Sequence, residues 1–417
     1  MKKILSQKVI MSSAILLAFC LSIFVTQCSD ADQRQLVKPN KDWSKKMAQS
    51  AMFQMGAFDL EGEGQFQFTF LEEFEKWNYQ LGVYLKSLLD LWHQTGDQVY
   101  FNYVKQSMDK FVQDDGTILT YEIEKYSLDE INTGKILLEL YDVTKEERYL
   151  TAVETLVEQL KDHPRTDAGG FWHKKQYYHQ MWLDGVYMWT PFYARYVSML
   201  GSESNYNDII FQIEFLYNKT KDPETGLLYH AWDESRKERW SNPETGLSPE
   251  FWGRAIGWYM MALVDVLDYL PADYSGRETV ISILNELSQS LLNYQDEESG
   301  VWFQVVDQGT RQGNYLEASS SSMYVYTMLK GIRNGYLPDE WIPSLEKAYQ
   351  GLIDQFVVVD GGGLAQLTRI CGGAGLGRDP YRSATYKYYV TEDIITNDLK
   401  GLGPFIMASL EIEKIRD

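Results

Sequence analysis

Apolar residues recur three and four positions apart along most of the chain, whereas long alternations of apolar and polar residues are almost absent. This spacing predicts a mainly helical protein. The helices come in pairs joined by short polar turns. The first two pairs comprise a helix ending at 88–92, a turn at 94–97 and a helix at 100–112, then a helix at 137–141, a turn at 143–147 and a helix at 149–160.

Four more pairs complete the pattern. They are 178–200 with a turn at 201–204 and a restart at Tyr206, 251–270 with Pro271 in its turn, 315–336 with Pro338 in its turn, and a final helix at 398–415 closing against 43–55. One hairpin cannot bury its apolar face alone, whereas six in a ring share a continuous core. The sequence therefore predicts an all-α fold, an (α/α)6 barrel of six hairpins. The alternative is an open helical solenoid, which the long and uneven connections disfavour.

The long connections are rich in Gly, Trp and His, and they cover 167–179, 225–249, 300–314 and 361–397. In a helical ring they would meet at one mouth and hold short strands. Functional residues concentrate on connections carried by a rigid scaffold. We therefore expect the binding cleft at this mouth.

Composition supports a globular protein that binds a polar ligand. The chain is 44% hydrophobic and 24% charged, which excludes a disordered chain, and its 14% aromatic share is high. Aromatic residues line many sugar clefts, although they also fill helix interfaces. The formal charge of −20 makes nucleic acid an improbable partner.

The first residues have the build of a secretory signal. Lys2, Lys3 and Lys8 precede an uncharged apolar run from Val9 to Val25. We expect residues 1–27 to be a signal peptide, 28–42 a linker and 43–417 a single catalytic domain. Removal of the signal would change the formal charge from −20 to −23, because it contains three lysines and no acid.

Cys28 follows Val25-Thr26-Gln27 and precedes an acidic stretch, an order that resembles a bacterial lipoprotein cleavage site. We expect lipidation of Cys28 and an exported, periplasmic or outer-membrane lipoprotein of a bacterium, with a lipid anchor as its only membrane contact. The alternative is an uncleaved anchor, since the apolar run approaches the length of a membrane span. Only Cys28 and Cys371 would remain, which argues against a disulfide framework.

Two aspartates are the candidate acids. Asp184 lies in the apolar, aromatic run Met181-Trp182-Leu183-Asp184-Gly185, where a carboxyl group is either a helix cap or a buried acid with a raised pKa. Asp129 lies at the start of another predicted helix, and its simplest interpretation is a cap for free backbone amides.

Basic and aromatic residues stand in the same connections. His173 and His230 are two of only five histidines, and imidazole can donate to sugar hydroxyls or carboxylates. Arg254, flanked by Trp252 and Trp258, suits an anionic sugar whose ring stacks on the indoles, although a structural acid could be its partner instead. No phosphate loop, nucleophile elbow or metal-spaced Cys/His cluster occurs in the sequence, so we expect no cofactor and no metal.

These segments resemble the unsaturated rhamnogalacturonyl hydrolases, which are α/α-barrel glycosidases related to the unsaturated glucuronyl hydrolases. The resemblance covers nearly all of the chain after the signal. It rests on 128–132, 171–174, 181–185, 230–233, 252–258 and 397–405. Gly253-Arg254-Ala255-Ile256-Gly257 departs from the Ala-Arg-Gly-Asn-Gly of many members.

The resemblance implies an enzyme that removes a 4,5-unsaturated uronic acid from the nonreducing end of lyase-generated oligosaccharides without a metal. Asp184 would protonate C4 of the vinyl ether and activate water for C5, and Asp129 would orient the substrate and tune Asp184. By the same resemblance, the substrate-contacting residues are His173, Lys174, His230, Trp252 and Arg254, with Tyr79 facing the cleft.

Two other functions fit the residues taken alone. A conventional glycosidase or a sugar epimerase could use the same barrel on a saturated sugar, because a fold does not fix its chemistry. A surface lipoprotein that binds glycans without turnover would also explain the aromatic residues and Cys28. The parent polysaccharide and the second sugar of the substrate are not readable from the sequence.

Overall fold

The computed structural model describes residues 42–55 and 75–416. Contacts group the chain into Met1–Asn40 and Lys41–Asp417, and all described elements belong to the second unit. The predicted signal peptide, Cys28 and most of the predicted linker lie outside the described residues. Within the described ranges, every helix is too short or too polar to span a lipid bilayer.

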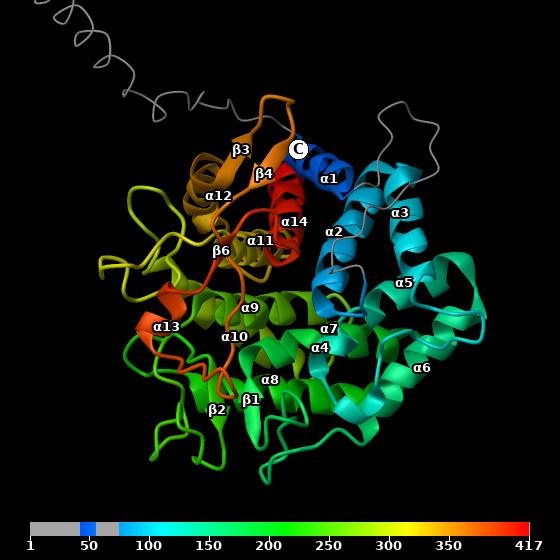
Figure 1. Ribbon diagram of the computed structural model, residues 1–417, viewed down its shortest axis with the longest axis horizontal. Coiled ribbons are helices and arrows are strands. Elements are labelled where there is room, and N and C mark those ends of the chain that lie inside the picture. Colours follow the sequence, from blue (N-terminus) through cyan, green and yellow to red (C-terminus); the bar gives the residue numbers. More distant parts are fainter. Residues whose placement is uncertain (1–41, 56–74, 417) are drawn as a thin grey trace, which may run out of the picture. The chain divides into compact units, whose positions relative to one another are not determined.

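The second unit is a ring of helical hairpins, so the predicted (α/α)6 barrel is confirmed (Figure 1). Each inner helix packs against the next in the order α2, α5, α7, α9, α11 and α14, and α14 packs back against α2. The inner helices are α2 (Tyr79–Thr95), α5 (Gly134–Thr144), α7 (Leu183–Leu200), α9 (Gly253–Val266), α11 (Ala318–Arg333) and α14 (Leu399–Arg416).

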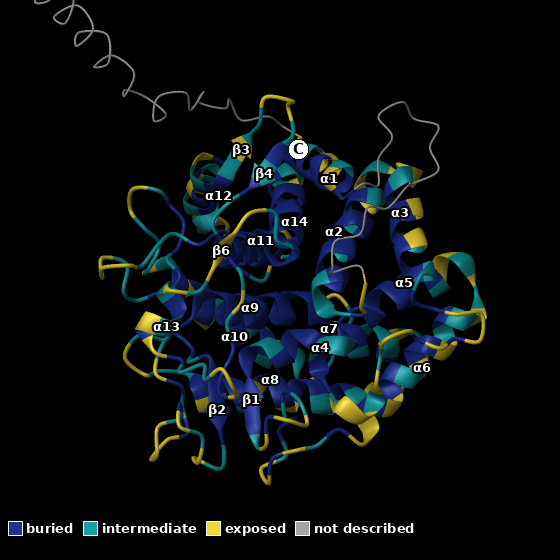
Figure 2. Ribbon diagram, viewed as in Figure 1, coloured by how far each residue is buried: buried dark blue, intermediate teal, exposed yellow. Residues whose placement is uncertain are grey.

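An outer helix covers each inner one and buries one apolar face against it. The outer helices are α1 (Trp43–Gln54), α3 (Gln98–Asp109), α6 (Glu147–Lys161), α8 (Tyr206–Thr220), α10 (Arg277–Leu292) and α12 (Ile342–Phe356). Figure 2 shows the contrast: α9 is buried along its whole length, whereas α6 alternates buried and exposed residues. The predicted closure of the last helix on the first is confirmed, since α14 packs against α1.

Short elements fill the connections. They are α4 (Leu128–Ile131), α13 (Tyr386–Val390), three 3-10 turns at 123–125, 203–205 and 339–341, and the strands β1 (Gln180–Trp182), β2 (Ala231–Asp233), β3 (Val357–Val359), β4 (Ala365–Leu367), β5 (Ile370–Cys371) and β6 (Ile394–Ile395). The strands pair as three antiparallel ribbons, β1 with β2, β3 with β4 and β5 with β6. The sequence had predicted short strands in these connections.

The predicted turns follow from local chemistry. Gly96 ends α2 at φ 70°, a left-handed conformation that glycine adopts without strain, and Asp97 caps α3 by accepting from the Val99 amide. Three predicted helix starts are two to five residues too early, and the predicted starts of α3 at Tyr100 and of α6 at Tyr149 are each two residues too late. The 178–182 segment is loop and strand because β2 pairs with it, and α11 begins at Ala318 because the Glu317 carboxylate accepts from the amides of Ser319 and Ser320. In the fourth pair, α9 begins at Gly253 rather than Phe251.

Glycine allows the inner helices to approach one another closely. A Cβ on Gly403 of α14 would lie 2.8 Å from the Val83 carbonyl oxygen of α2, and one on Gly82 would lie 2.8 Å from the Thr133 Cα before α5. Any larger side chain would push these backbones apart. The N-terminal half of α2 therefore sits tightly between its two inner neighbours.

Candidate active site

The first turns of the inner helices meet at one end of the ring. Tyr79 opens α2, and the charges of Asp129, Arg254, Asp398 and Asp184 all perturb its pKa, which burial raises well above the ordinary value. These side chains come from the starts of α2, α4, α9, α14 and α7. Sequence positions more than 300 residues apart thus share one site.

Asp184 lies in the first turn of α7 and is 13% exposed, enough to meet a ligand. The β1–β2 ribbon sets its position, because the Leu183 amide donates to the His230 carbonyl oxygen at 3.0 Å. His230 Nε2 lies 3.2 Å from Asp184 Oδ2, an ion-pair distance without hydrogen-bond alignment. The Tyr389 hydroxyl bonds His230 Nδ1 at 2.8 Å on the other side of the ring.

The expectation of a raised pKa for Asp184 is wrong for the free protein. Burial does raise it, but the neighbouring His230, and more weakly His173, outweigh burial and hold the pKa below its ordinary value. Asp184 is not the helix cap either, since α7 is preceded by Trp182 and no side chain caps it. The carboxylate is therefore charged and paired with an imidazole.

Asp129 sits in the short helix α4 and is 15% exposed. Lys174 forms an ion pair with its Oδ2, and His173 Nε2 lies 3.3 Å from its Oδ1. The backbone explains this group, because a bridge between Ser127 and Lys174 brings the two segments together. The contacts described for the Asp129 carboxylate are with these side chains, so helix capping is not its main role.

His173 connects the two aspartates. Burial lowers its pKa to about 4, although Asp129 and Asp184 both act in the opposite direction. Its ring is therefore neutral near pH 7. It stacks on Trp182 with ring centroids 4.5 Å apart, and the edge of the same indole faces His230 at 5.4 Å.

Arg254 lies in the first turn of α9 and is 1% exposed. Its Nη1 donates to the Cys371 carbonyl oxygen, while Nε is buried without a hydrogen-bond partner among the described residues. No carboxylate in the described ranges forms an ion pair with it. A structural acid, the competing interpretation, therefore does not pair with it directly, although the charges of Glu317 and Asp398 act on the guanidinium and raise its pKa.

The two indoles are as deeply buried as Arg254. Trp252 and Trp258 are each 1% exposed, so they present almost no surface to solvent in this structure. Trp252 stacks on Tyr389 at 5.7 Å and holds the Arg254 guanidinium over its ring at 4.8 Å. Trp258 stacks on Tyr187 at 5.2 Å and meets the edge of Tyr79. Both indoles therefore pack against side chains of the site.

Four residues of this region were not predicted. Tyr389 bonds His230, Gln304 donates to the Tyr389 carbonyl oxygen, Glu317 binds the Cys371 amide, and Tyr177 stacks on Trp182. The Tyr386-Lys387-Tyr388-Tyr389 run within the long 361–397 connection was the available signal for Tyr389. Gln304, Glu317 and Tyr177 carry no comparable local signal.

A closed ring of paired helices brings two partly exposed carboxylates, two buried imidazoles and an arginine without an ion pair in the described ranges to one mouth, an arrangement typical of the class of α/α-barrel glycosidases. Comparison with known proteins identifies the family. The model described as Glycosyl Hydrolase Family 88 matches residues 43–416. The chain belongs to this family, and it is a glycosidase.

The chain is also similar to individual proteins. The solved structure of a C. acetobutylicum glycoside hydrolase from family 105 is 45% identical, with a TM-score of 0.84 over 89% of this chain and 99% of that one. The unsaturated rhamnogalacturonyl hydrolase YesR of Bacillus subtilis is 25% identical over 76% of this chain and 86% of its own length. A protein of Agrobacterium fabrum is 37% identical over 54% of this chain and 97% of its own.

The pairing of Asp184 with His230 leads to a first prediction. In a His230→Gln variant of the free protein, the pKa of Asp184 should rise, because burial remains while the opposing imidazole is gone. Carbon-13 NMR titration of labelled aspartate carboxyls measures this pKa. His173→Gln is the matched control and should produce a smaller rise. An unchanged or lower pKa in His230→Gln would contradict the assignment.

Proposed function

We propose that this glycosidase removes a 4,5-unsaturated uronic acid from the nonreducing end of oligosaccharides made by polysaccharide lyases. The observation that carries the proposal is that two side chains lie at the same mouth: the partly exposed Asp184, and Arg254, a buried cation without an ion-pair partner among the described residues. A uronate supplies the anion that Arg254 lacks. The B. subtilis relative named as an unsaturated rhamnogalacturonyl hydrolase favours a rhamnogalacturonan-type substrate.

The chemistry needs one acid that then serves as a base. Asp184 gives its proton to C4 of the vinyl ether, which leaves a cation at C5 stabilised by the ring oxygen. Water adds to C5 and returns a proton to Asp184. The hemiketal then opens, and the sugar attached at C1 is released. Ordinary glycosidases instead protonate the leaving oxygen and use a second carboxylate as nucleophile or base.

The low pKa of Asp184 in the free protein is compatible with this role. Asp184 must be protonated when the substrate is bound, and the bound uronate would place another negative charge near it. The sugar would also displace water from the carboxyl group. Both effects raise a carboxyl pKa and oppose the lowering by His230, by His173 and by a backbone hydrogen bond. Substrate binding would therefore prepare the acid.

Asp129 would act through position and charge. Its carboxylate is held by Lys174 and faces the neutral ring of His173, which in turn lies near Asp184. A sugar hydroxyl could bind between Asp129 and Lys174, whose side chain is 23% exposed. Tyr79 would face the same sugar from α2.

The mechanism predicts the behaviour of Asp184→Asn. This variant should fold and bind but lose about 10²- to 10⁴-fold in turnover, the usual cost of removing a general acid or base. The assay follows the ultraviolet absorbance of the double bond. Asp129→Asn is the comparison variant and should weaken turnover less. Near-normal activity of Asp184→Asn would refute the assignment.

Isotope labelling separates this mechanism from direct hydrolysis within the same experiment. In deuterated water, protonation at C4 requires deuterium on that carbon of the released keto-sugar, which mass spectrometry or NMR detects. Direct cleavage of the glycosidic bond would leave C4 unlabelled and the double bond intact. A conventional glycosidase would also cleave the saturated analogue.

Arg254 provides an independent prediction about the uronate. Arg254→Lys keeps the charge but loses the bidentate contact, so binding of the unsaturated substrate should weaken by about 1.5–3 kcal/mol. The loss should appear mostly in KM. An analogue with an uncharged amide in place of the carboxylate should be affected far less. Equal losses for both compounds would identify Arg254 as structural.

The N-terminal residues support a proposal on location. We propose export and lipidation at Cys28, from the order of the charged start, the apolar run and the acidic stretch after the cysteine. In cells that process lipoproteins, the protein should partition with membranes and its intact mass should include the lipid. Cys28→Ser should be found in the soluble fraction. A soluble, unmodified Cys28 protein would contradict the proposal.

A further inference from the structure

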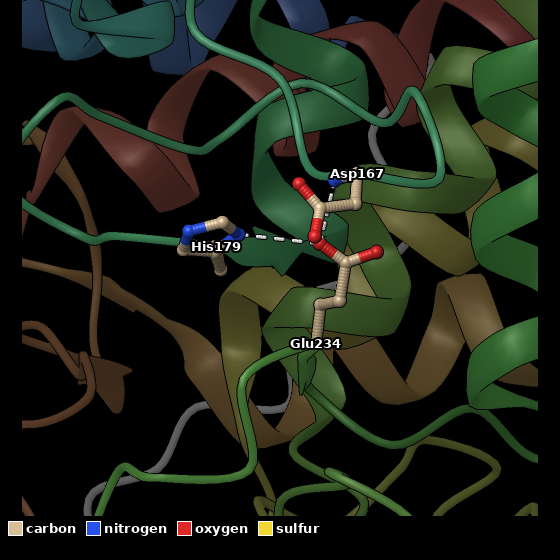
Figure 3. A group of neighbouring side chains, drawn as sticks. All are labelled: Asp167, His179 and Glu234. Carbon is tan, nitrogen blue, oxygen red and sulfur yellow. Dashed lines mark hydrogen bonds and ion pairs between the residues drawn. The ribbon is translucent and has the colours of Figure 1, made fainter.

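A second group of ligand-type side chains lies at the outer end of the β1–β2 ribbon. It consists of Asp167, His179 and Glu234, and one ligand atom from each lies within 4.8 Å of the others (Figure 3). His179 directly precedes β1 and Glu234 directly follows β2. Asp167 comes from the connection after α6. The group is separate from Asp184 and His230, which adjoin the opposite end of the ribbon.

The backbone fixes Glu234 firmly. Its carboxylate accepts from the Asp167 amide at 2.7 Å and from the Ala168 amide at 2.9 Å, and it lies 3.2 Å from His179 Nδ1. The His179 ring packs against Trp172 with centroids 4.9 Å apart. The Asp167 side chain is exposed. In Figure 3 its carboxylate faces that of Glu234.

The charges of this group are not balanced by protein cations. No lysine or arginine in the described ranges forms an ion pair with Asp167 or Glu234, whereas the nearby Arg165 is committed to Asp208. Two carboxylates this close repel each other. A bound cation would remove the repulsion.

We propose that Asp167, His179 and Glu234 bind one divalent transition-metal ion of the Zn²⁺ class. Zn²⁺ takes histidine nitrogen and carboxylate oxygen at about 2.0–2.2 Å in a tetrahedral arrangement, which separates two ligand atoms by roughly 3.3 Å. In the structure a hydrogen bond of 3.2 Å joins His179 Nδ1 to Glu234, which is close to this separation, so an ion could replace the shared proton with little movement of either side chain. Ca²⁺ prefers about six to eight oxygens, which one imidazole and two carboxylates do not supply. Water would complete the coordination.

The ion would fasten the ribbon without taking part in the reaction. The Glu234 amide already donates to the His179 carbonyl oxygen at 3.0 Å, and β1 and β2 pair from there toward the Asp184 end. A metal bond across the open end would hold both strands and the Asp167 turn together. The ribbon positions Asp184 beside His230, so its stability matters to the active site.

Calorimetric titration of the metal-stripped, full chain without a polyhistidine tag tests the proposal, with Zn²⁺ as the probe. We expect one ion per chain. Asp167→Asn should weaken binding at least about tenfold, since it removes one ligand of three. His179→Gln should abolish specific binding. Because Asp167 is exposed, its variant should fold normally.

His93→Gln is the matched control. His93 also faces a carboxylate, with Nε2 2.8 Å from Glu139, but within the described ranges it belongs to no group of three such ligand-type side chains. It should leave Zn²⁺ affinity unchanged. Co²⁺ should give d–d absorption bands that are lost in His179→Gln and kept in His93→Gln.

Stability provides the second readout. At a hundredfold excess over Kd, Zn²⁺ should raise the Tm by about 3 °C, and hydrogen exchange should slow in 177–184 and 230–236. Equal Zn²⁺ affinity in the parent and His179→Gln proteins would overturn the proposal. So would the absence of stoichiometric binding, or Ca²⁺ binding that matches Zn²⁺ and survives His179→Gln.

Discussion

The common direction of the six inner helices is the constraint on which the rest of the structure depends. Each hairpin returns the chain to the same end, so the first turns of α2, α7, α9, α11 and α14 converge with α4 and the start of α5. Free amides at such ends favour anions by about 0.3–1 kcal/mol each, and the effect fades within a turn. A direct guanidinium contact is worth more, about 1.5–3 kcal/mol. The helix ends therefore favour an anion, and in the proposed function Arg254 would supply the main contact.

The same convergence explains how two aspartates behave differently in one mouth. Asp184 faces His230, which holds its pKa low, while Asp129 is held by Lys174 and faces a neutral His173. Trp182 separates the two imidazoles by stacking on one and presenting its edge to the other. Each carboxylate thus has its own partner. A bound uronate would disturb the Asp184 pair more than the Asp129 pair if C4 of the sugar lies at Asp184.

The hairpin pattern was predictable because it depends on local chemistry. Apolar spacing identifies each helix, and Gly96 with Asp97 marks a turn that any context would favour. The starts of α7 and α11 were placed too early because non-local partners decide them. β2 pairs with 180–182, and the Glu317 carboxylate that caps α11 also binds the Cys371 amide, 54 residues away.

For the site, the sequence by itself determined the residue types and their places, with Asp129, Asp184 and Arg254 at helix starts and His173 and His230 in the connections. It also determined the helical repeat that makes a ring. Only the tertiary structure decided the partners of these side chains. The pKa of Asp184 and the lack of an ion pair at Arg254 both depend on which groups come within a few ångströms. Burial alone predicts a raised pKa for Asp184, and only the ribbon that brings His230 to 3.2 Å reverses the sign. The burial of Trp252 under Tyr389 was equally invisible, since that contact joins residues 137 positions apart through packing that no local pattern encodes.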